Sequence, residues 1–288
     1  MPRRRLSALV LGAAALQACG AAAAEPAPTL VLDGLSSPSG LAVWRRPTGE
    51  PELLVAEEGR VVALPIGENA GKPVRTVIEE LPPGPTRLAA TPDGAVLAAS
   101  DGLLARYEPA PQTSEPAAQV ELPGGKPTAL VASADHAFTV HSGSLRRSRL
   151  VAGRLTESRE VRADCLAAAF APRGYLAALL GPTEGDTALR LALMNPAEPG
   201  EQAVEMPVEG LASPTAIAFG GRSSDAVLYA IDADGLCRID SDLDASGRPR
   251  GVAKRLAEIE DPRSLAAATD GAAYVTTGDG RVLSWPPD

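Results

Sequence analysis

The chain has 288 residues, a formal net charge of −9 and three cysteines, and 45% of its residues are hydrophobic. This length is enough for one large all-β domain. Nucleic acids and anionic lipid surfaces both require a basic surface on the protein, so an acidic chain disfavours these two classes of partner. Aromatic residues make up only 3% of the chain, which disfavours a sugar-binding surface built from exposed rings.

The first residues have the features of an export signal. Arg3, Arg4 and Arg5 precede an apolar stretch of 13 residues over positions 6–18. That stretch is too short to span a bilayer and has the length of the apolar core of a signal peptide. We therefore expect residues 1–24 to be a signal peptide and residues 25–288 to form a single exported domain, periplasmic or extracellular. Loss of residues 1–24 would take the formal charge from −9 to −12, because they carry three arginines and no acid.

Two processing sites compete within this signal. Leu16-Gln17-Ala18-Cys19 resembles a bacterial lipobox, in which Cys19 would be lipidated and become the new N-terminus. The three alanines at 22–24 instead fit the small-residue site of ordinary signal peptidase. Gln17 is unusual in a lipobox, so both alternatives stay open. Contact with a membrane is expected only through a lipid anchor at Cys19.

A short phrase returns six times along the rest of the chain. The copies are PSGLAV at 38–43, PTRLAA at 85–90, PTALVA at 127–132, DCLAAA at 164–169, PTAIAF at 214–219 and PRSLAA at 262–267. Their starts are 47, 42, 37, 50 and 48 residues apart, close to the period of roughly 40–50 residues that a propeller blade has. The repeat predicts an all-β fold, a six-bladed β-propeller with four-stranded blades.

The second copy shows the expected unit most clearly. It predicts strands over residues 86–90, 95–100, 103–107 and 118–122, with a tight turn at Asp101-Gly102 that needs a positive φ at both residues. The last copy runs out of sequence after a third strand at 281–285. Residues 29–32 supply the missing strand, so we expect the N-terminal strand to join the C-terminal blade and close the ring, which also covers an exposed sheet edge.

Two cysteines remain after processing. The alignment of the repeats places Cys165 in the first strand of the fourth blade and Cys237 in the third strand of the fifth. Those positions are too far apart for a disulfide, so two separate buried thiols are expected.

The repeats resemble those of a known family. Pro38, Gly40 to Val43, Leu54 to Glu57 and Arg60-Val61 are similar to one NHL repeat, and a second similar stretch begins at Pro214. The resemblance extends over nearly all of residues 29–288 and includes the SMP-30/gluconolactonase-like and strictosidine synthase-like six-bladed propellers. Its motifs are short and apolar, so they identify a fold rather than an activity.

The resemblance implies a metal site that this chain lacks in its usual form. SMP-30-like lactonases hold a divalent metal with a Glu, an Asn and an Asp, and Ser36 stands where that Glu would be. Asn69 and Asn195 both fall outside the inner strands. A metal-dependent enzyme would therefore need another ligand set, for which the candidates are the acids Glu57, Asp101, Asp232 and Asp279. The alternative is that these four acids stabilise hairpin turns.

Two other groups of residues have the chemistry of metal ligands. His136 and His141 lie on one short strand, roughly 16 Å apart and on opposite faces, so they cannot share a metal. Asp240, Asp242 and Asp244 alternate as calcium ligands do. Ala245 and Gly251, however, occupy the positions where a calcium loop of the EF-hand type has its Gly and its bidentate Glu.

These observations favour an exported, non-catalytic module that binds a small molecule or a protein and needs no cofactor. The alternative is a metal-dependent SMP-30-like lactonase or hydrolase with an altered site, using a divalent ion such as Ca²⁺. A degenerate former enzyme kept as a scaffold is a third possibility.

The export hypothesis makes a prediction about the mature N-terminus. Mass spectrometry of protein purified from its native cell should find either a diacylglyceryl-modified Cys19 or a chain that starts at Glu25. An intact N-terminus at Met1 would contradict export.

Overall fold

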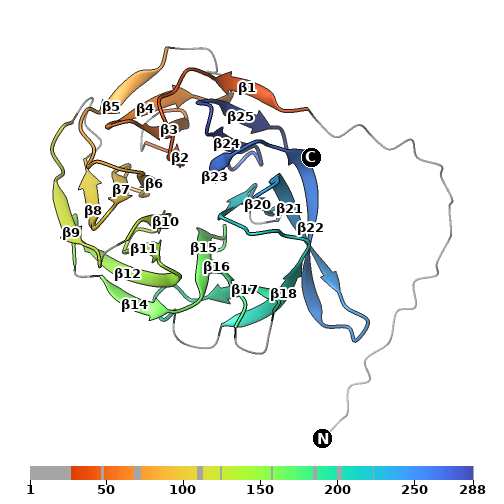
Figure 1. The fold of residues 1–288 in the computed structure, drawn as a ribbon. Coiled ribbons are helices and arrows are strands. Elements are labelled where there is room, and N and C mark those ends of the chain that lie inside the picture. The colour runs from red at the N-terminus through yellow and green to blue at the C-terminus, as the bar shows by residue number, and fades with distance from the viewer. Residues whose placement is uncertain are drawn as a thin grey trace, which may run out of the picture.

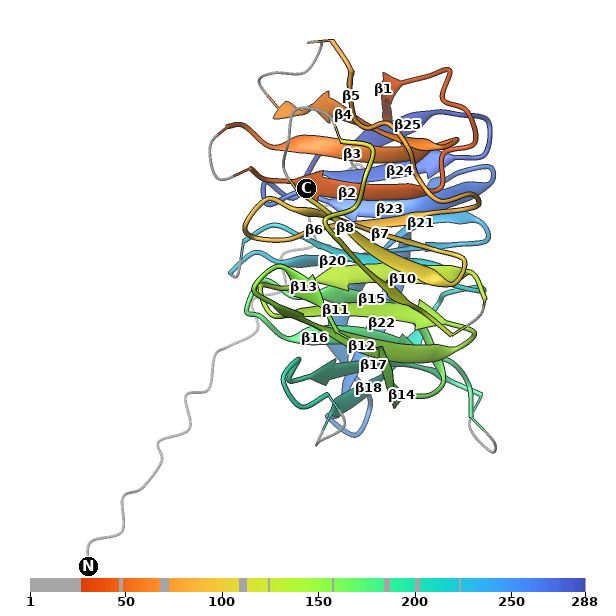
Figure 2. The same cartoon turned by 90° about the vertical axis from the view of Figure 1, so that its left-hand side faces the viewer.

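The computed structural model describes residues 27–46, 49–67, 73–108, 113–123, 125–156, 158–183, 187–199, 203–222 and 224–287. Strands account for the regular structure of these residues, and they form a ring around an open centre (Figure 1). From the side, the strands run roughly along the axis of that ring (Figure 2). Within these ranges no apolar helix reaches the length needed to cross a bilayer. Cys19 and Asn69 lie outside the described residues.

The strands group into four-stranded units in chain order. Blade 1 is β2 (Gly40–Trp44), β3 (Glu52–Glu57), β4 (Arg60–Pro65) and β5 (Arg75–Ile78). Blade 2 is β6 (Arg87–Ala90), β7 (Val96–Ser100), β8 (Leu103–Tyr107) and β9 (Ala118–Glu121). Blade 3 is β10 (Pro127–Ala132), β11 (His136–His141), β12 (Ser144–Val151) and β14 (Arg159–Arg162), with the short β13 (Arg154–Leu155) also on β12.

The second half repeats this plan. Blade 4 is β15 (Cys165–Phe170), β16 (Leu176–Leu180), β17 (Leu189–Met194) and β18 (Val204–Glu209). Blade 5 is β19 (Ala216–Gly220), β20 (Val227–Asp232), β21 (Gly235–Leu243) and β22 (Pro249–Glu258). Blade 6 is β23 (Pro262–Ala267), β24 (Ala273–Thr277), β25 (Val282–Trp285) and β1 (Thr29–Leu32).

The first strands of the six blades form the inner wall. Each contacts the next in the order β2, β6, β10, β15, β19 and β23, and β23 contacts β2 again. The described residues therefore form a closed ring of six blades, and the predicted propeller is confirmed. The strand limits expected for blade 2 agree with the observed ones to within a residue.

The N-terminal strand closes the ring as predicted. β1 pairs antiparallel with β25, with Thr29 opposite Ser284 and Leu30 opposite Leu283. Val31 and Leu32 pack against an apolar cluster formed by residues of blades 6 and 1. The pairing joins the two ends of the chain through one ladder of hydrogen bonds.

Six apolar clusters fill the spaces between neighbouring blades. Side chains are small where the blades converge. Between blades 4 and 5, for example, Ala167, Ala169 and Ala177 pack with Ala230. Blades 1 and 2 approach closely at Gly40, where an added Cβ would lie 2.3 Å from the carbonyl oxygen of Thr86. Only glycine allows β2 and β6 to come this near.

The expected turn geometry at Asp101-Gly102 is wrong. Gly102 has a φ of 75°, but Asp101 has no positive φ, which is the φ pattern of a type II turn. Such a turn needs a left-handed backbone at one residue only. Gly102 adopts it, so Asp101, which has a Cβ, avoids the steric cost of a positive φ. Both residues do have a positive φ at Ser142-Gly143 (47° and 80°) and at Ala152-Gly153 (47° and 76°).

The two cysteines lie where the repeats placed them, in β15 and β21. Both are buried and free. Burial raises the pKa of Cys165 to about 12 and that of Cys237 to about 11, so both stay protonated thiols at neutral pH.

The sequence did not indicate that blades 4 and 5 are joined. β18 pairs parallel with β22 at Val208 opposite Gly251 and Glu209 opposite Val252, which makes one eight-stranded sheet of the two blades. The β21–β22 hairpin is also longer than the others, and its tip projects beyond the ring (Figure 1).

The ring closure can be tested by truncation. A chain that begins at Asp33 should unfold several degrees below one that begins at Thr29, because it loses the β1–β25 ladder and the burial of Val31 and Leu32, together worth about 2–4 kcal/mol. The two chains differ only by β1 and should be compared by thermal unfolding. Equal midpoints would contradict a role of β1 in the ring.

Candidate functional site

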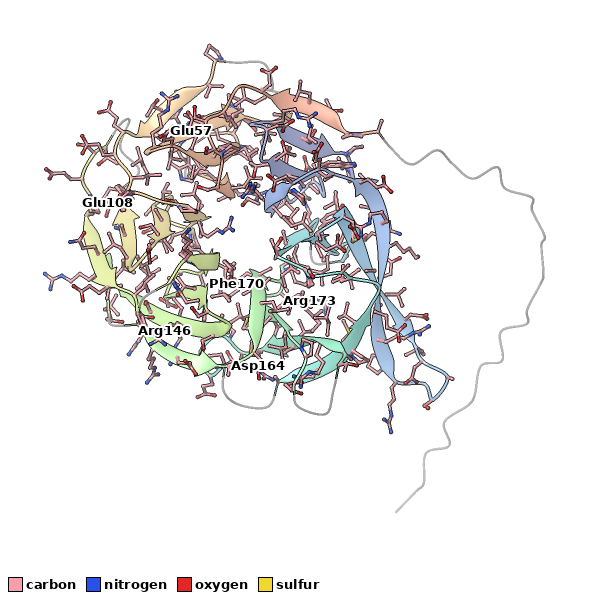
Figure 3. All side chains as sticks on the ribbon, in the orientation of Figure 1. Glu57, Glu108, Arg146, Asp164, Phe170 and Arg173 are labelled. Atoms are coloured by element: carbon pink, nitrogen blue, oxygen red, sulfur yellow. The ribbon has the colours of Figure 1, made fainter. Side chains whose placement is uncertain are left out.

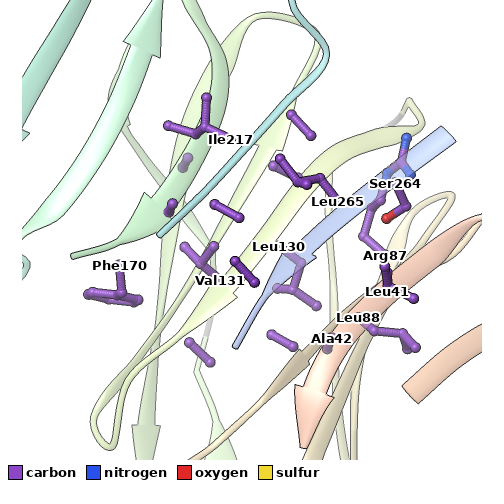
Figure 4. A pocket seen from close by; sticks show the side chains of 18 of the residues that line it. Leu41, Ala42, Arg87, Leu88, Leu130, Val131, Phe170, Ile217, Ser264 and Leu265 are labelled. Carbon is purple, nitrogen blue, oxygen red and sulfur yellow. The ribbon is translucent and has the colours of Figure 1, made fainter. Parts of the chain in front are cut away.

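The central channel has an apolar wall. It encloses about 260 Å³ and is lined by all six inner strands. Most of the lining side chains are leucine, alanine, valine, isoleucine or phenylalanine, and Phe170 stands beside the opening (Figures 3 and 4). The polar side chains of the lining are those of Arg87, Thr128 and Ser264. In Figure 4 the Arg87 and Ser264 side chains lie together, at the opposite side of the view from Phe170.

A larger pocket of about 620 Å³ lies at the mouth of the channel where the inner strands begin. Blades 1, 2 and 6 and their connecting loops line it. Its walls include Pro38, Leu81, Pro83 and Pro85, and Arg87 belongs to the lining of both this pocket and the channel. Arg87 therefore stands where the two spaces adjoin.

Arg87 carries a charge that no acid of the described residues neutralises. Its Nη1 donates to the carbonyl oxygen of Ser39 and, at 3.0 Å, to that of Arg263. Its Nε is buried with no hydrogen-bond partner, and the like charge of Arg263 acts on the guanidinium. Burial and the Arg263 charge both lower the pKa of Arg87. A cation kept from water without a counter-ion is costly, so this position favours an anion.

Two acids at the mouth, Glu57 and Asp261, already have partners, and a third, Glu58, is exposed to solvent. Glu57 is buried, accepts from Arg60 Nε at 2.7 Å and from the Ser36 amide at 3.1 Å, and so belongs to blade 1 (Figure 3). Asp261 pairs with Arg263 at 2.6 Å. Glu58 lines the pocket but is exposed to solvent. The net result is a mouth in which Arg87 has free hydrogen-bonding capacity.

Sequence reasoning missed Arg87, although the repeat contains a signal for it. The third residue of the six phrases is Gly40, Arg87, Ala129, Leu166, Ala216 and Ser264. A single charged residue among small and apolar ones at an inward-facing position indicates a special role at that blade.

The four acids proposed as metal ligands are not brought together. Glu57 and Asp232 are buried at the ends of the second strands of blades 1 and 5. Asp101 and Asp279 are exposed in hairpin turns, and Asp279 pairs with Arg281 at 2.6 Å. Across the described ranges, no three His, Cys, Asp or Glu side chains gather closely enough to hold one metal ion.

Glu57 and Asp232 instead bind the segment that leads into the inner strand of their own blade. The Ala212 amide donates to Asp232 Oδ2 at 3.0 Å, as the Ser36 amide does to Glu57. Both amides lie two residues before the proline that opens the inner strand. Arg255 donates to both Asp232 oxygens, at 2.6 and 3.0 Å. Burial alone would raise the pKa of Asp232, but the bonds from Arg255 and two backbone amides lower it below its ordinary value.

The two histidines have separate surroundings. His136 and His141 are the first and last residues of β11. His141 is buried, with Nδ1 3.3 Å from the carbonyl oxygen of Gly125, which is again two residues before an inner-strand proline. Burial and, to a lesser extent, nearby arginines lower the pKa of both rings.

The candidate calcium ligands are held by different partners on the β21–β22 hairpin. Asp240 pairs with Lys254 at 2.6 Å and with Arg238 at 2.8 Å. Asp242 pairs with Arg250 at 3.2 Å. Asp244 accepts from the backbone amides of two turn residues, both at 2.8 Å. Asn195 lies after β17 and accepts from the Ala197 amide at 3.0 Å, away from the inner strands.

No protein-family model matches this sequence, and no curated protein is similar enough to count as a relative. Solved structures do match the fold. A gluconolactonase from Xanthomonas campestris superposes with a TM-score of 0.61 at 12% sequence identity, over 90% of this chain and 89% of that one. The chain is a β-propeller protein.

Two further propellers support the same assignment. The PQQ-bound aldose sugar dehydrogenase from Streptomyces coelicolor gives a TM-score of 0.55 at 18% identity, over 89% of this chain and 96% of that one. Virginiamycin B lyase from Staphylococcus aureus gives a TM-score of 0.55 at 13% sequence identity, over 90% of this chain and 87% of that one. At such identities the likeness shows the fold alone.

The Asp232–Arg255 pair yields a pH-dependent stability prediction. Asp232→Asn should lower the free energy of unfolding at pH 7 by about 2 kcal/mol, since it removes charge-assisted hydrogen bonds at a buried site. Because the folded state lowers the pKa of Asp232, its contribution is present above the unfolded pKa of about 3.9 and is lost as the pH falls through the folded value.

Urea unfolding of both proteins between pH 3 and 7 measures this, and the difference should shrink in acid. Asp234→Asn is the control, because its carboxylate is exposed and lies 3.6 Å from the same Arg255. A deficit for Asp232→Asn that stays constant with pH would contradict the role of its charge.

Proposed function

We propose that this protein is an exported, non-catalytic binding module that takes up a small organic anion at the mouth of its channel. The observation that carries the proposal is Arg87, a half-buried arginine without a carboxylate partner among the described residues. We further propose that the repeats beginning at Pro38 and Pro214 belong to the NHL and SMP-30-like group.

The chemistry of the pocket points to a carboxylate attached to an apolar body. The Nη2 group of Arg87 has no hydrogen-bond partner among the described residues and can donate to a carboxylate oxygen. Pro38, Leu81, Pro83 and Pro85 offer apolar surface beside it. The pocket volume of about 620 Å³ lies within the range of roughly 300–1,000 Å³ that small-molecule sites have.

The side chains near Arg87 supply binding rather than acid–base chemistry. A guanidinium stays protonated and cannot act as a general base. Ser39 Oγ accepts from the Thr86 amide at 3.0 Å and donates to the Thr86 carbonyl, so this hydroxyl is occupied by the backbone. Glu57 is held by Arg60 and the Ser36 amide. The remaining wall of the channel is largely apolar.

Arg87→Gln should abolish binding of a simple carboxylate. We expect benzoate and hexanoate to raise the unfolding temperature of the wild type relative to chloride at equal ionic strength. The same carboxylates should leave the unfolding temperature of Arg87→Gln unchanged, because glutamine keeps a polar side chain but has no charge and no guanidinium. Arg173→Gln is the control, since Arg173 is an exposed arginine of the β15–β16 turn. A benzoate effect that persists in Arg87→Gln would contradict the site.

The lactonase alternative requires a different result. Assays with sugar lactones, with and without Ca²⁺, Mn²⁺ or Zn²⁺, should show no metal-dependent turnover. Chelator-sensitive turnover that is lost in Asp101→Ala or Asp232→Ala would replace the binding proposal by the enzyme.

A further inference from the structure

Blade 3 is basic in an otherwise acidic protein. Residues 127–162 contain six arginines and three acidic residues, whereas the whole chain has a formal charge of −9. The arginines belong to the outer strands β12, β13 and β14, and Figure 3 labels one of them, Arg146, in the outer part of the ring. They are therefore separated from the channel mouth, where Arg87 begins the inner strand of blade 2.

Three of these arginines share one face of the blade. β12 pairs antiparallel with β14, and Arg147 stands directly opposite Arg159. Arg149 lies two residues further along β12 and therefore points to the same side. Like charges at directly opposed positions destabilise a sheet, so the sequence maintains an unfavourable pair here.

No acid of the described residues neutralises this cluster. Arg147 is only 8% exposed; its Nη1 donates to the backbone carbonyls of Pro196 and Ala197, and its Nε is buried without a partner. Burial and the charges of Arg159 and Arg149 lower the pKa of Arg147. The carboxylate of Glu160 lies 3.6 Å from Arg146, which is on the other face of β12.

A pocket of about 390 Å³ adjoins the cluster. Arg147 and residues 159–161 of β14 line one side, and residues 197–199, from the loop that follows β17 in blade 4, line the other. Two acids, Glu160 and Glu198, also line this pocket, but both side chains are exposed to solvent, and Glu160 pairs with Arg146 at 3.6 Å. The space thus has two guanidinium groups in its wall, a third arginine on the same face, and room for a small anion.

We propose that this pocket between blades 3 and 4 binds a phosphate or sulfate group, free or carried by a larger molecule. Guanidinium groups match the oxygens of such anions in pairs, and a doubly charged tetrahedral anion can be shared by two of them at once. The anion would supply the counter-charge that the Arg147–Arg159 pair lacks.

Calorimetric titration with inorganic phosphate and sulfate tests the proposal, with NaCl as the ionic-strength control. We expect saturable binding of one anion to the wild type and an affinity at least tenfold lower for Arg159→Gln. The Arg159 side chain makes no hydrogen bond or ion pair with the described residues, so the variant should fold. It removes one of two like charges, so in chloride it should unfold at or above the wild-type temperature. Arg173→Gln should bind as the wild type does.

Two further titrations identify the source of the phosphate group and distinguish this pocket from the proposed carboxylate site at Arg87. Glycerol 3-phosphate that binds more tightly than phosphate would identify a phosphorylated molecule as the source, and equal or weaker binding would identify the free anion. Benzoate binding should survive in Arg159→Gln, so the carboxylate site at Arg87 and the phosphate site at Arg159 can be disproved independently of each other. Absence of phosphate and sulfate binding to the wild type, or equal affinity in Arg159→Gln, would overturn the proposal.

Discussion

The structure depends on how closely six inner strands can approach one axis. Each first strand must contact the strands of two neighbouring blades, and the wall they form leaves a channel of only about 260 Å³. This crowding explains why alanine fills the converging faces and why Gly40 has no tolerable replacement at its distance from Thr86. The same crowding places Arg87 where water reaches it poorly, and the binding site proposed at the mouth is a consequence of that position.

Buried polar groups define where each blade begins. At the end of the second strand, Glu57 and Asp232 accept an amide hydrogen from the segment that leads into the inner strand, and His141 contacts the corresponding carbonyl. An apolar residue could fill this space, but it would leave a backbone group without a partner. Acids that look like candidate metal ligands in the sequence thus have a structural task, which is to fix the register between linker and blade.

The periodic part of the fold could be read from the sequence because it is local. The phrase that begins each blade and the apolar second strands depend on which faces are buried, and that pattern repeats within each blade. The closing strand at 29–32 pairs far along the chain with β25, and it was predicted because the last repeat lacks a fourth strand. Whether a polar side chain has a hydrogen-bond partner or a counter-ion depends on residues that lie far away in the sequence. Arg87 bonds to Ser39 and Arg263, which are 48 and 176 residues away.

Other differences between the predictions from sequence and the structure also arise from contacts between residues that are distant in the chain. Whether a carboxylate is available to a ligand was decided by partners such as Arg255 for Asp232, which no motif indicates. The Asp101-Gly102 pair predicted a hairpin correctly, but the backbone has one left-handed residue there in place of two. The basic face of blade 3 was hidden by the overall acidic charge, because a net charge contains no information about where the arginines gather.

The parallel pairing of β18 with β22 has a consequence for how the ring opens. β22 is bonded on both edges near Gly251 and Val252, and Arg250 adds a salt bridge to Glu209 at 3.1 Å. An outer strand of a propeller normally presents one free edge to solvent, from which a sheet can fray. Here the outermost strands of two blades protect each other, so blades 4 and 5 should exchange their amide hydrogens as one cooperative unit. Local unfolding would then begin in the other four blades, and most readily at the β1 edge of blade 6.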